Sequence, residues 1–158
     1  MRKIGVAALT IMMSMLGAAV QAKAQAVPGK VGESASAAAT EFAAKKARGQ
    51  QVAAVWLALI DDGKYVDSWK QSAGFFRNAV PQEQWEQMMR GYRQPLGKNV
   101  SREIAAVQYV TTMPAAPDGE YVLVDYTSAF ERKKHATESV TVMKDTDNIW
   151  RVSGYFIQ

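Results

Sequence analysis

The sequence predicts an α+β domain in which three N-terminal helices pack on a curved four-stranded antiparallel sheet. Apolar residues recur with a period near 3.6 before Gly97 and with a period of two after it. The later apolar segments are joined by short, turn-rich connections. Short connections favour antiparallel neighbours, because a parallel crossover needs about a dozen residues or more. Helices segregated from an antiparallel sheet are typical of α+β domains.

The expected helices cover residues 52–60, 65–76 and 81–92, with Gly63 ending the first and Pro81 opening the third. Each has an apolar stripe along one face. We expect the four tryptophans to be buried, since aromatic residues at this spacing are more often core than a ligand cage. The expected core residues of the helices are Val52, Val55, Trp56, Leu59, Ile60, Tyr65, Trp69, Ala73, Phe76, Trp85, Met88, Met89 and Tyr92.

The expected strands cover residues 101–112, 120–130, 136–144 and 149–157. A dense turn signal at residues 114–119 separates the first two strands. Residues 145–148 form the expected hairpin loop between the last two. The order of elements therefore predicts consecutive neighbours throughout the sheet.

The first 26 residues have the pattern of a secretory signal peptide: a basic start, an apolar stretch from Ile4 to Val20, and small residues around Ala24. The alternative is a retained membrane anchor, but the apolar stretch reaches only the lower end of the ~17–25 residues that a spanning helix needs. We expect residues 1–26 to be cleaved and the mature protein to be periplasmic, without a membrane anchor. Residues 27–50 are predicted to be an Ala-rich spacer, and residues 51–158 a single domain.

Composition argues against several classes of function. The chain has no cysteine and one histidine, His135, which lies in a charged connection, so we expect no metal site. Three of the 19 basic residues and none of the 15 acidic ones fall in the leader, so the mature net charge is about +1. This charge does not favour nucleic-acid binding. The sequence has no glycine-rich phosphate loop, and we expect no cofactor.

Several segments occur in an order that resembles a bacterial family of exported domains of unknown function. They are Trp56–Asp61, Gly63–Tyr65, Trp69, Trp85, Arg93–Gly97, Ser101–Arg102, Pro117–Tyr121, Phe130, Glu138–Thr141 and the closing Trp150–Tyr155, whose Trp-Arg-Val-x-Gly-Tyr pattern is the most specific. The resemblance extends from Val52 to Ile157. The order of helices and strands also resembles the cone-shaped fold of nuclear transport factor two and the ketosteroid isomerases. That fold serves enzymes, binding modules and docking domains, so it implies no single function.

Two charged residues are the candidate ligand-binding residues. Glu138 shares strand parity with Val140, and Arg102 shares it with Ile104, so each charge is expected on an apolar face. A buried carboxylate needs a partner, and arginine is the natural one. We therefore predict that Arg102 and Glu138 form a pair near the mouth of the cone, serving either as an architectural ion pair or as a ligand site. Asp125 has the opposite parity and is expected to face outward or toward a subunit partner.

The sequence contains no recognisable catalytic motif. We therefore expect a non-enzymatic binding or protein-interaction module whose partner is a small molecule or a protein. A homodimer is left open. The alternative is a small cone-fold enzyme, an isomerase or hydrolase, that uses Glu138 as its general acid or base.

Overall fold

The computed structural model describes residues 30–158, so the predicted leader lies outside the described residues. Within that range the chain forms four α-helices, then a π-helical and a 3-10 turn, then four strands. The helical elements are α1 (Lys30–Asp61), α2 (Tyr65–Lys70), α3 (Gly74–Ala79), α4 (Gln82–Met88), η1 (Met89–Arg93) and η2 (Gln94–Leu96). The strands are β1 (Asn99–Val110), β2 (Tyr121–Phe130), β3 (Lys133–Lys144) and β4 (Trp150–Ile157).

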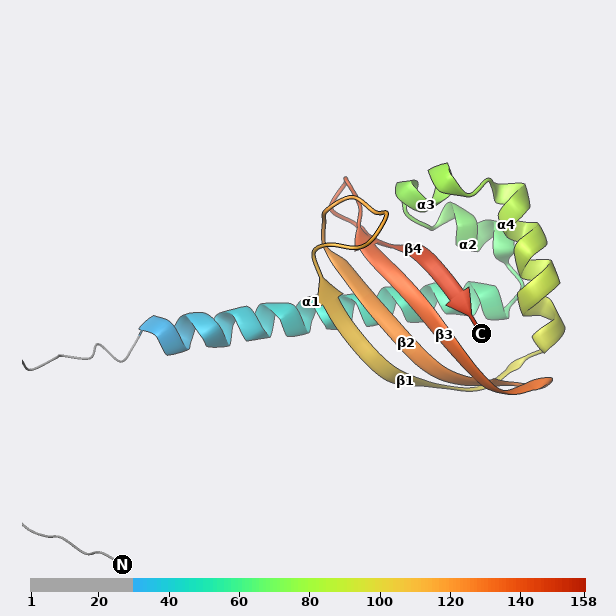
Figure 1. Cartoon of the computed structure of the whole chain (residues 1–158), viewed down its shortest axis with the longest axis horizontal. Helices are drawn as coiled ribbons and strands as arrows, with labels where there is room; N and C mark the ends of the chain where they lie inside the picture. Colours follow the sequence, from blue (N-terminus) through green and yellow to red (C-terminus); the bar gives the residue numbers. More distant parts are fainter. Residues whose placement is uncertain (1–29) are drawn as a thin grey trace, which may run out of the picture.

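The four strands form one antiparallel sheet in the order β1-β2-β3-β4, as the sequence predicts. The long helix α1 crosses the sheet, and its N-terminal part projects beyond it (Figure 1). The short helices α2, α3 and α4 gather at the other end of the molecule, near the C-terminal end of α1 (Figure 1). The α+β class is thus confirmed, whereas the likeness to a cone-shaped fold stays a prediction.

The segment predicted as a spacer is helical from Lys30 onward and touches the sheet before Val52. The rings of Phe42 and Tyr109 lie 5.3 Å apart, and Lys45 Nζ lies 2.8 Å from a carboxylate oxygen of Glu120. A Cβ atom on Gly49 would overlap the side chain of Val122, so glycine is what allows α1 to approach β2 this closely. Local sequence patterns do not reveal these contacts, because the partners lie far apart along the chain.

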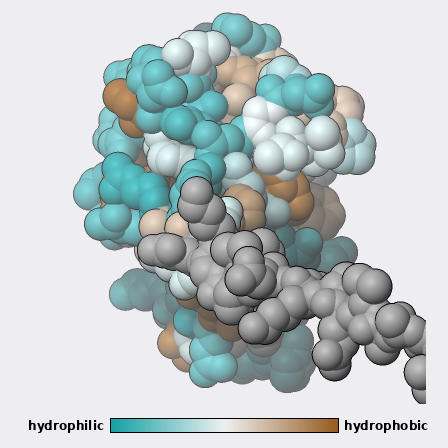
Figure 2. Space-filling model, turned by 90° about the vertical axis from the view of Figure 1, so that its left-hand side faces the viewer, coloured by the Kyte–Doolittle hydropathy of each residue, from teal (hydrophilic) through white to brown (hydrophobic). Residues whose placement is uncertain are grey.

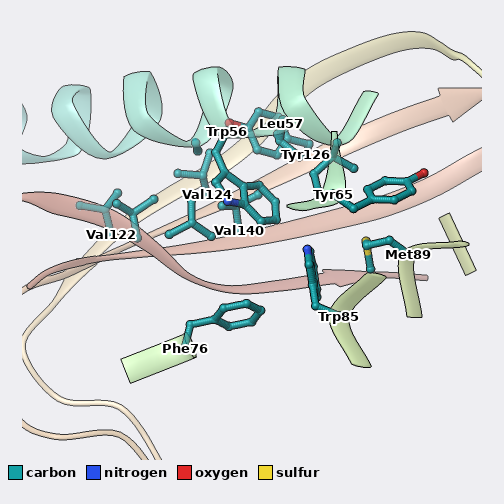
Figure 3. Close-up of a cluster of buried hydrophobic side chains, with 14 residues drawn as sticks. Trp56, Leu57, Tyr65, Phe76, Trp85, Met89, Val122, Val124, Tyr126 and Val140 are labelled. Atoms are coloured by element: carbon teal, nitrogen blue, oxygen red, sulfur yellow. The ribbon is translucent and has the colours of Figure 1, made fainter. Parts of the chain in front are cut away.

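The core fills the space between α1, the short helices and the facing side of the sheet. Figure 3 shows Trp56 and Leu57 of α1 above the valines of β2 and β3, with Phe76 and Trp85 approaching from the short helices. Trp85 packs edge-on against Phe76, with ring centroids 5.2 Å apart, and lies 5.8 Å from Trp56. Trp56 and Trp85 are buried as expected, whereas Trp69 and Trp150 are only partly buried.

The prediction of three helices is wrong, because the second expected helix is two helices. The chain leaves helical geometry at Ala73, whose extended backbone donates its N–H to the carbonyl of Val152 in β4 at 2.8 Å. The Ser72 hydroxyl meanwhile donates to the Ser68 carbonyl and accepts from Trp56 Nε1. The hydrogen bond from Ala73 to the sheet thus interrupts the helix between α2 and α3. The spacing of apolar residues does not reveal this interruption.

The expected burial of Met88 and Tyr92 is also wrong. The π-helical turn η1 begins at Met89 and widens the helix, which shifts the side chains that follow. Tyr92 is consequently 72% exposed, and the next residue, Arg93, is buried at the position that faces the domain interior. Val55, also expected in the core, is 60% exposed, because the buried stripe of α1 contains Ala53 and Leu57 beside Trp56.

Strand β1 carries a bulge between Ile104 and Ala106. The bulge changes parity, so that Arg102 and Ile104 before it, and Val107 and Tyr109 after it, lie opposite core-facing residues of β2. This explains why the apolar residues of β1 do not follow one strict alternation in the sequence. Ile104 shares the face of Arg102 as expected but remains half exposed at the edge of the sheet.

Across residues 30–158, no helix has both the length and the apolar character needed to cross a bilayer. The face seen in Figure 2 is mainly hydrophilic among the coloured residues, with small apolar patches between them.

Candidate functional site

Arg102 of β1 and Glu138 of β3 form the ion pair that their strand parity predicts. Arg102 Nε donates to Glu138 Oε2 at 2.7 Å, and Nη2 donates to Oε1 at 3.1 Å. This is a bidentate arrangement, in which the planar guanidinium fits both carboxylate oxygens. Strand β2 lies between β1 and β3, so the pair spans the width of three strands.

Glu138 is fully buried and accepts two further hydrogen bonds. Ser128 Oγ of β2 donates to Oε2 at 2.6 Å, and the Tyr155 hydroxyl of β4 donates to Oε1 at 2.7 Å. Each carboxylate oxygen therefore has two donors, which matches its two lone pairs. Every strand of the sheet contributes a side chain to this cluster.

Asp61, the last residue of α1, extends the cluster to the helices. Its carboxylate accepts from Arg102 Nη1 at 2.7 Å and from Arg102 Nη2 at 3.0 Å. It also accepts from Arg93 Nη2 at 2.8 Å, and Arg93 Nη1 donates to the Gly97 carbonyl at 2.8 Å. We call Asp61, Arg93, Arg102, Ser128, Glu138 and Tyr155 the charged network.

The electrostatics of the charged network favour the ionised forms of Asp61 and Arg102. Burial raises the pKa of Asp61, but hydrogen bonds and charge from Arg102 and Arg93 outweigh burial and hold this pKa below its usual value. Burial lowers the pKa of Arg102, yet the bonds from Asp61 and Glu138 raise it overall. Burial and the neighbouring Glu138 raise the pKa of the Tyr155 hydroxyl, so Tyr155 stays a neutral donor.

This geometry limits what the charged network can do chemically. A general base needs a free lone pair directed at the proton it removes, and the carboxylate of Glu138 has none. The two buried polar atoms without a partner in the described residues are Arg93 Nε and the Tyr126 hydroxyl. The charged network therefore joins the C-terminal end of α1 and the π-helical turn η1 to side chains from all four strands. The role of Arg102 and Glu138 in ligand binding stays a prediction.

The other residues considered from the sequence lie apart from the charged network. His135 is exposed on β3, and Asp125 accepts a hydrogen bond from Ser139 Oγ at 2.6 Å on the opposite face of the sheet. In the part of the chain that the structure describes, no three acidic, histidine or cysteine residues are placed to hold a metal ion.

Two hollows on the surface involve strand β4. The first, which we call the β4-edge groove, has a volume of about 270 Å³ and lies between α4, η1 and the end of β4. Its lining is apolar and consists of Met88, Met89, Tyr92, Tyr155, Phe156 and Ile157. The second, which we call the α1–β4 groove, has a volume of about 450 Å³ and lies between α1, the end of α2 and the start of β4.

The backbone of β4 is open along the first of these grooves. The backbones of Thr137 in β3 and Gln158 exchange two hydrogen bonds, at 2.9 and 3.0 Å. Two residues further along each strand, Ser139 lies opposite Phe156. Since bonded pairs alternate along an antiparallel ladder, the N–H and C=O groups of Tyr155 and Ile157 point away from β3. Within residues 30–158, the backbone bond from the helical segment to this edge is the one from Ala73 to Val152.

Residues 52–155 match the model of a family described as "Protein of unknown function (DUF4019)". The chain belongs to this family. The match covers nearly the whole range in which the sequence resembles a family of unknown function. No curated protein and no solved structure matches the chain.

Four members of the charged network, all within the part of the chain that matches the DUF4019 model, were not predicted from the sequence: Asp61, Arg93, Ser128 and Tyr155. No local pattern reveals that these side chains meet, because they come from α1, η1, β2 and β4. The parity of Arg102 and Glu138 was the one usable signal.

Proposed function

We propose that this chain is an exported, non-enzymatic protein-interaction module that binds an extended segment of a partner protein at the β4-edge groove. In this proposal the charged network holds the helices and the sheet in fixed positions, and binding occurs at the surface. The filled core supports this reading, because aromatic side chains occupy the space that a substrate would need inside the domain.

The observation that carries the proposal is the open edge of β4 beside an apolar groove. Tyr155 and Ile157 direct their N–H and C=O groups outward, where a partner strand could pair with them. Tyr92, 72% exposed, and Phe156, 60% exposed, flank the same edge. Natural proteins usually protect open edges with charges, proline or a covering element, and exposed apolar patches mark interaction sites.

The size of the groove favours a peptide side chain over a free small molecule. Its volume of about 270 Å³ lies below the ~300–1,000 Å³ that is typical of small-molecule sites. An extended peptide places every second side chain on one face, so one apolar side chain enters the groove while the backbone pairs with β4. Met88 and Met89 line the groove and suit contact with varied peptide side chains, because methionine adapts its shape to different apolar partners.

Selection of peptides from a random display library tests the proposal. We expect wild-type protein to enrich peptides with apolar residues at alternate positions. Their affinity should fall about tenfold or more in Tyr92→Ser, because loss of one well-packed apolar anchor costs roughly 1–3 kcal/mol. Val100→Ser is the matched control, since Val100 is an exposed apolar residue on β1, the opposite edge strand of the sheet.

A second pair of variants separates backbone pairing from side-chain contact. Ile157→Pro removes an outward N–H that β3 does not use, whereas Ile157→Ala keeps that N–H and shortens the side chain. Strand addition predicts that the proline variant loses more affinity than the alanine variant. Peptides that bind both variants equally well would contradict strand addition.

The alternative function, a small cone-fold enzyme that uses Glu138 as general acid or base, has weaker support. The observation in its favour is that Glu138 is a fully buried carboxyl group beside Tyr126 and Tyr155. Its four hydrogen-bond donors leave no free position for a substrate proton.

Export to the periplasm rests on the leader pattern in residues 1–26. The intact mass of protein from an osmotic-shock fraction tests it, and cleavage near Ala22, Ala24 or Ala26 is the expected result. Full-length protein found solely in the membrane fraction would contradict it.

A further inference from the structure

We infer that the α1–β4 groove is a second binding site, which takes an organic anion with an apolar body such as a medium-chain carboxylate. The groove is separate from the β4-edge groove and shares none of its lining residues. The inference goes beyond the proposed protein-interaction function and does not depend on it.

The floor and rim of the groove expose apolar surface. Val55 on α1 is 60% exposed and Ile149 before β4 is 49% exposed, and both line the groove beside the partly buried Trp150. Exposed apolar side chains that converge on one concavity mark a binding site more often than isolated ones do. The volume of about 450 Å³ falls within the ~300–1,000 Å³ that small-molecule sites occupy.

The charges of the groove have one sign. Its charged lining residues are Arg48, Lys70 and Arg151, and no carboxylate lines it. Arg151 is neutralised by Asp147, which accepts from both of its Nη atoms at 2.7 Å. Arg48 and Lys70 form none of the ion pairs found in residues 30–158, and Arg48 bonds only to the neutral Gln51.

These two cations determine the chemistry of the ligand. Arg48 and Lys70 are exposed, whereas most half-buried cations of the described residues already face a carboxylate, for example Lys45 with Glu120 and Arg102 with Asp61. Arg48 and Lys70 instead flank an apolar surface, and a ligand that satisfies both features carries a negative head group on an apolar chain. A free carboxylate and an acidic lipid head group share this chemistry.

Titration with decanoate, followed by methyl NMR of Val55 and Ile149, tests the inference. We expect saturable shifts at both methyl groups with decanoate, and none with decyltrimethylammonium, which has the same chain and the opposite charge. Loss of one charged hydrogen-bond donor should weaken binding about tenfold, so Arg48→Ala and Lys70→Ala should each raise the Kd by that factor. Lys134→Ala, on the far hairpin, is the matched control, and Arg48→Lys should restore part of the affinity.

Vesicles distinguish the two sources of the anion. Co-sedimentation with phosphatidylglycerol vesicles, but not with phosphatidylcholine vesicles, that depends on Arg48 and Lys70 would assign the site to a lipid head group. Decanoate binding without co-sedimentation would assign it to a free organic anion. Failure of both, or equal binding of the cationic amphiphile, overturns the inference. Tyr92→Ser should leave decanoate binding unchanged, which separates this site from the β4-edge groove.

Discussion

Arg102 and Glu138 form a bidentate pair, 36 residues apart in the chain, in which the carboxylate is fully buried. The same guanidinium binds Asp61 at the end of α1, so one side chain connects the sheet to the long helix. The net stability of a buried pair is small when both partners are present, but loss of one partner leaves an uncompensated charge. The pair therefore fixes the relative positions of these elements more than it adds to overall stability.

Glu138→Gln should destabilise the fold by about 3–5 kcal/mol, because Arg102 loses a charge partner and keeps its own buried charge. Denaturant unfolding measures this change. Glu103→Gln is the matched control: Glu103 is exposed on β1, and its replacement should change stability by less than about 0.5 kcal/mol. Unchanged or improved stability of Glu138→Gln, with loss of a binding activity, would instead favour the ligand-site interpretation.

Acid should destabilise the domain through Glu120 and Asp61. Hydrogen bonds from Lys45 and Lys144 lower the pKa of Glu120 from 4.5 to about 2, and the pKa of Asp61 lies below 3.8. The unfolded chain thus binds these protons at higher pH than the folded chain does, so stability is present above pH 4.5 and is lost as the pH falls toward 2. Thermal melts from pH 7 to pH 2 should show this loss, and Glu120→Gln should show a smaller one. If the melting temperatures of wild type and Glu120→Gln fall equally between pH 4.5 and pH 2, Glu120 does not contribute to the acid sensitivity.

Trp56→Ala should lower stability by about 3–5 kcal/mol, since the indole is buried and its Nε1 donates to the Ser68 carbonyl. Trp150→Ala should cost less, because Trp150 is only partly buried at the rim of the core. Denaturant midpoints compare the two. A larger loss for Trp150→Ala than for Trp56→Ala would show that the core is centred elsewhere.

Truncation of the N-terminal segment should have two stages. Deletion of residues 27–39 removes the start of α1, which begins at Lys30 and precedes the contact of Phe42 with Tyr109, and the melting temperature should stay within a few degrees. Deletion of residues 27–44 also removes Phe42 and with it the contact to the Tyr109 ring. Such an aromatic contact is worth roughly 0.5–1.5 kcal/mol, so the melting temperature should fall further. Equal melting temperatures for the two truncations would mean that the Phe42 contact contributes nothing.

Local patterns predicted the parts of this fold that depend on local physics. The alternation of Val122, Val124 and Tyr126 identified β2, and parity alone placed Arg102 and Glu138 on one face. The same reasoning failed at η1, where the π-helical turn moves Tyr92 outward, and at Ala73, where a bond to β4 interrupts the helix. Asp61 and Arg93 could not be predicted as network members, because their contacts depend on how distant elements pack.

Amide hydrogen exchange at the end of β4 tests most directly the claim that this domain binds partners by strand addition. In the free protein, Phe156 should exchange slowly because its backbone pairs with Ser139, whereas the outward N–H groups of Tyr155 and Ile157 should exchange fast. A selected peptide should protect Tyr155 and Ile157 and leave Phe156 unchanged. A peptide that binds tightly while both outward amides continue to exchange at their free rates would contradict the account.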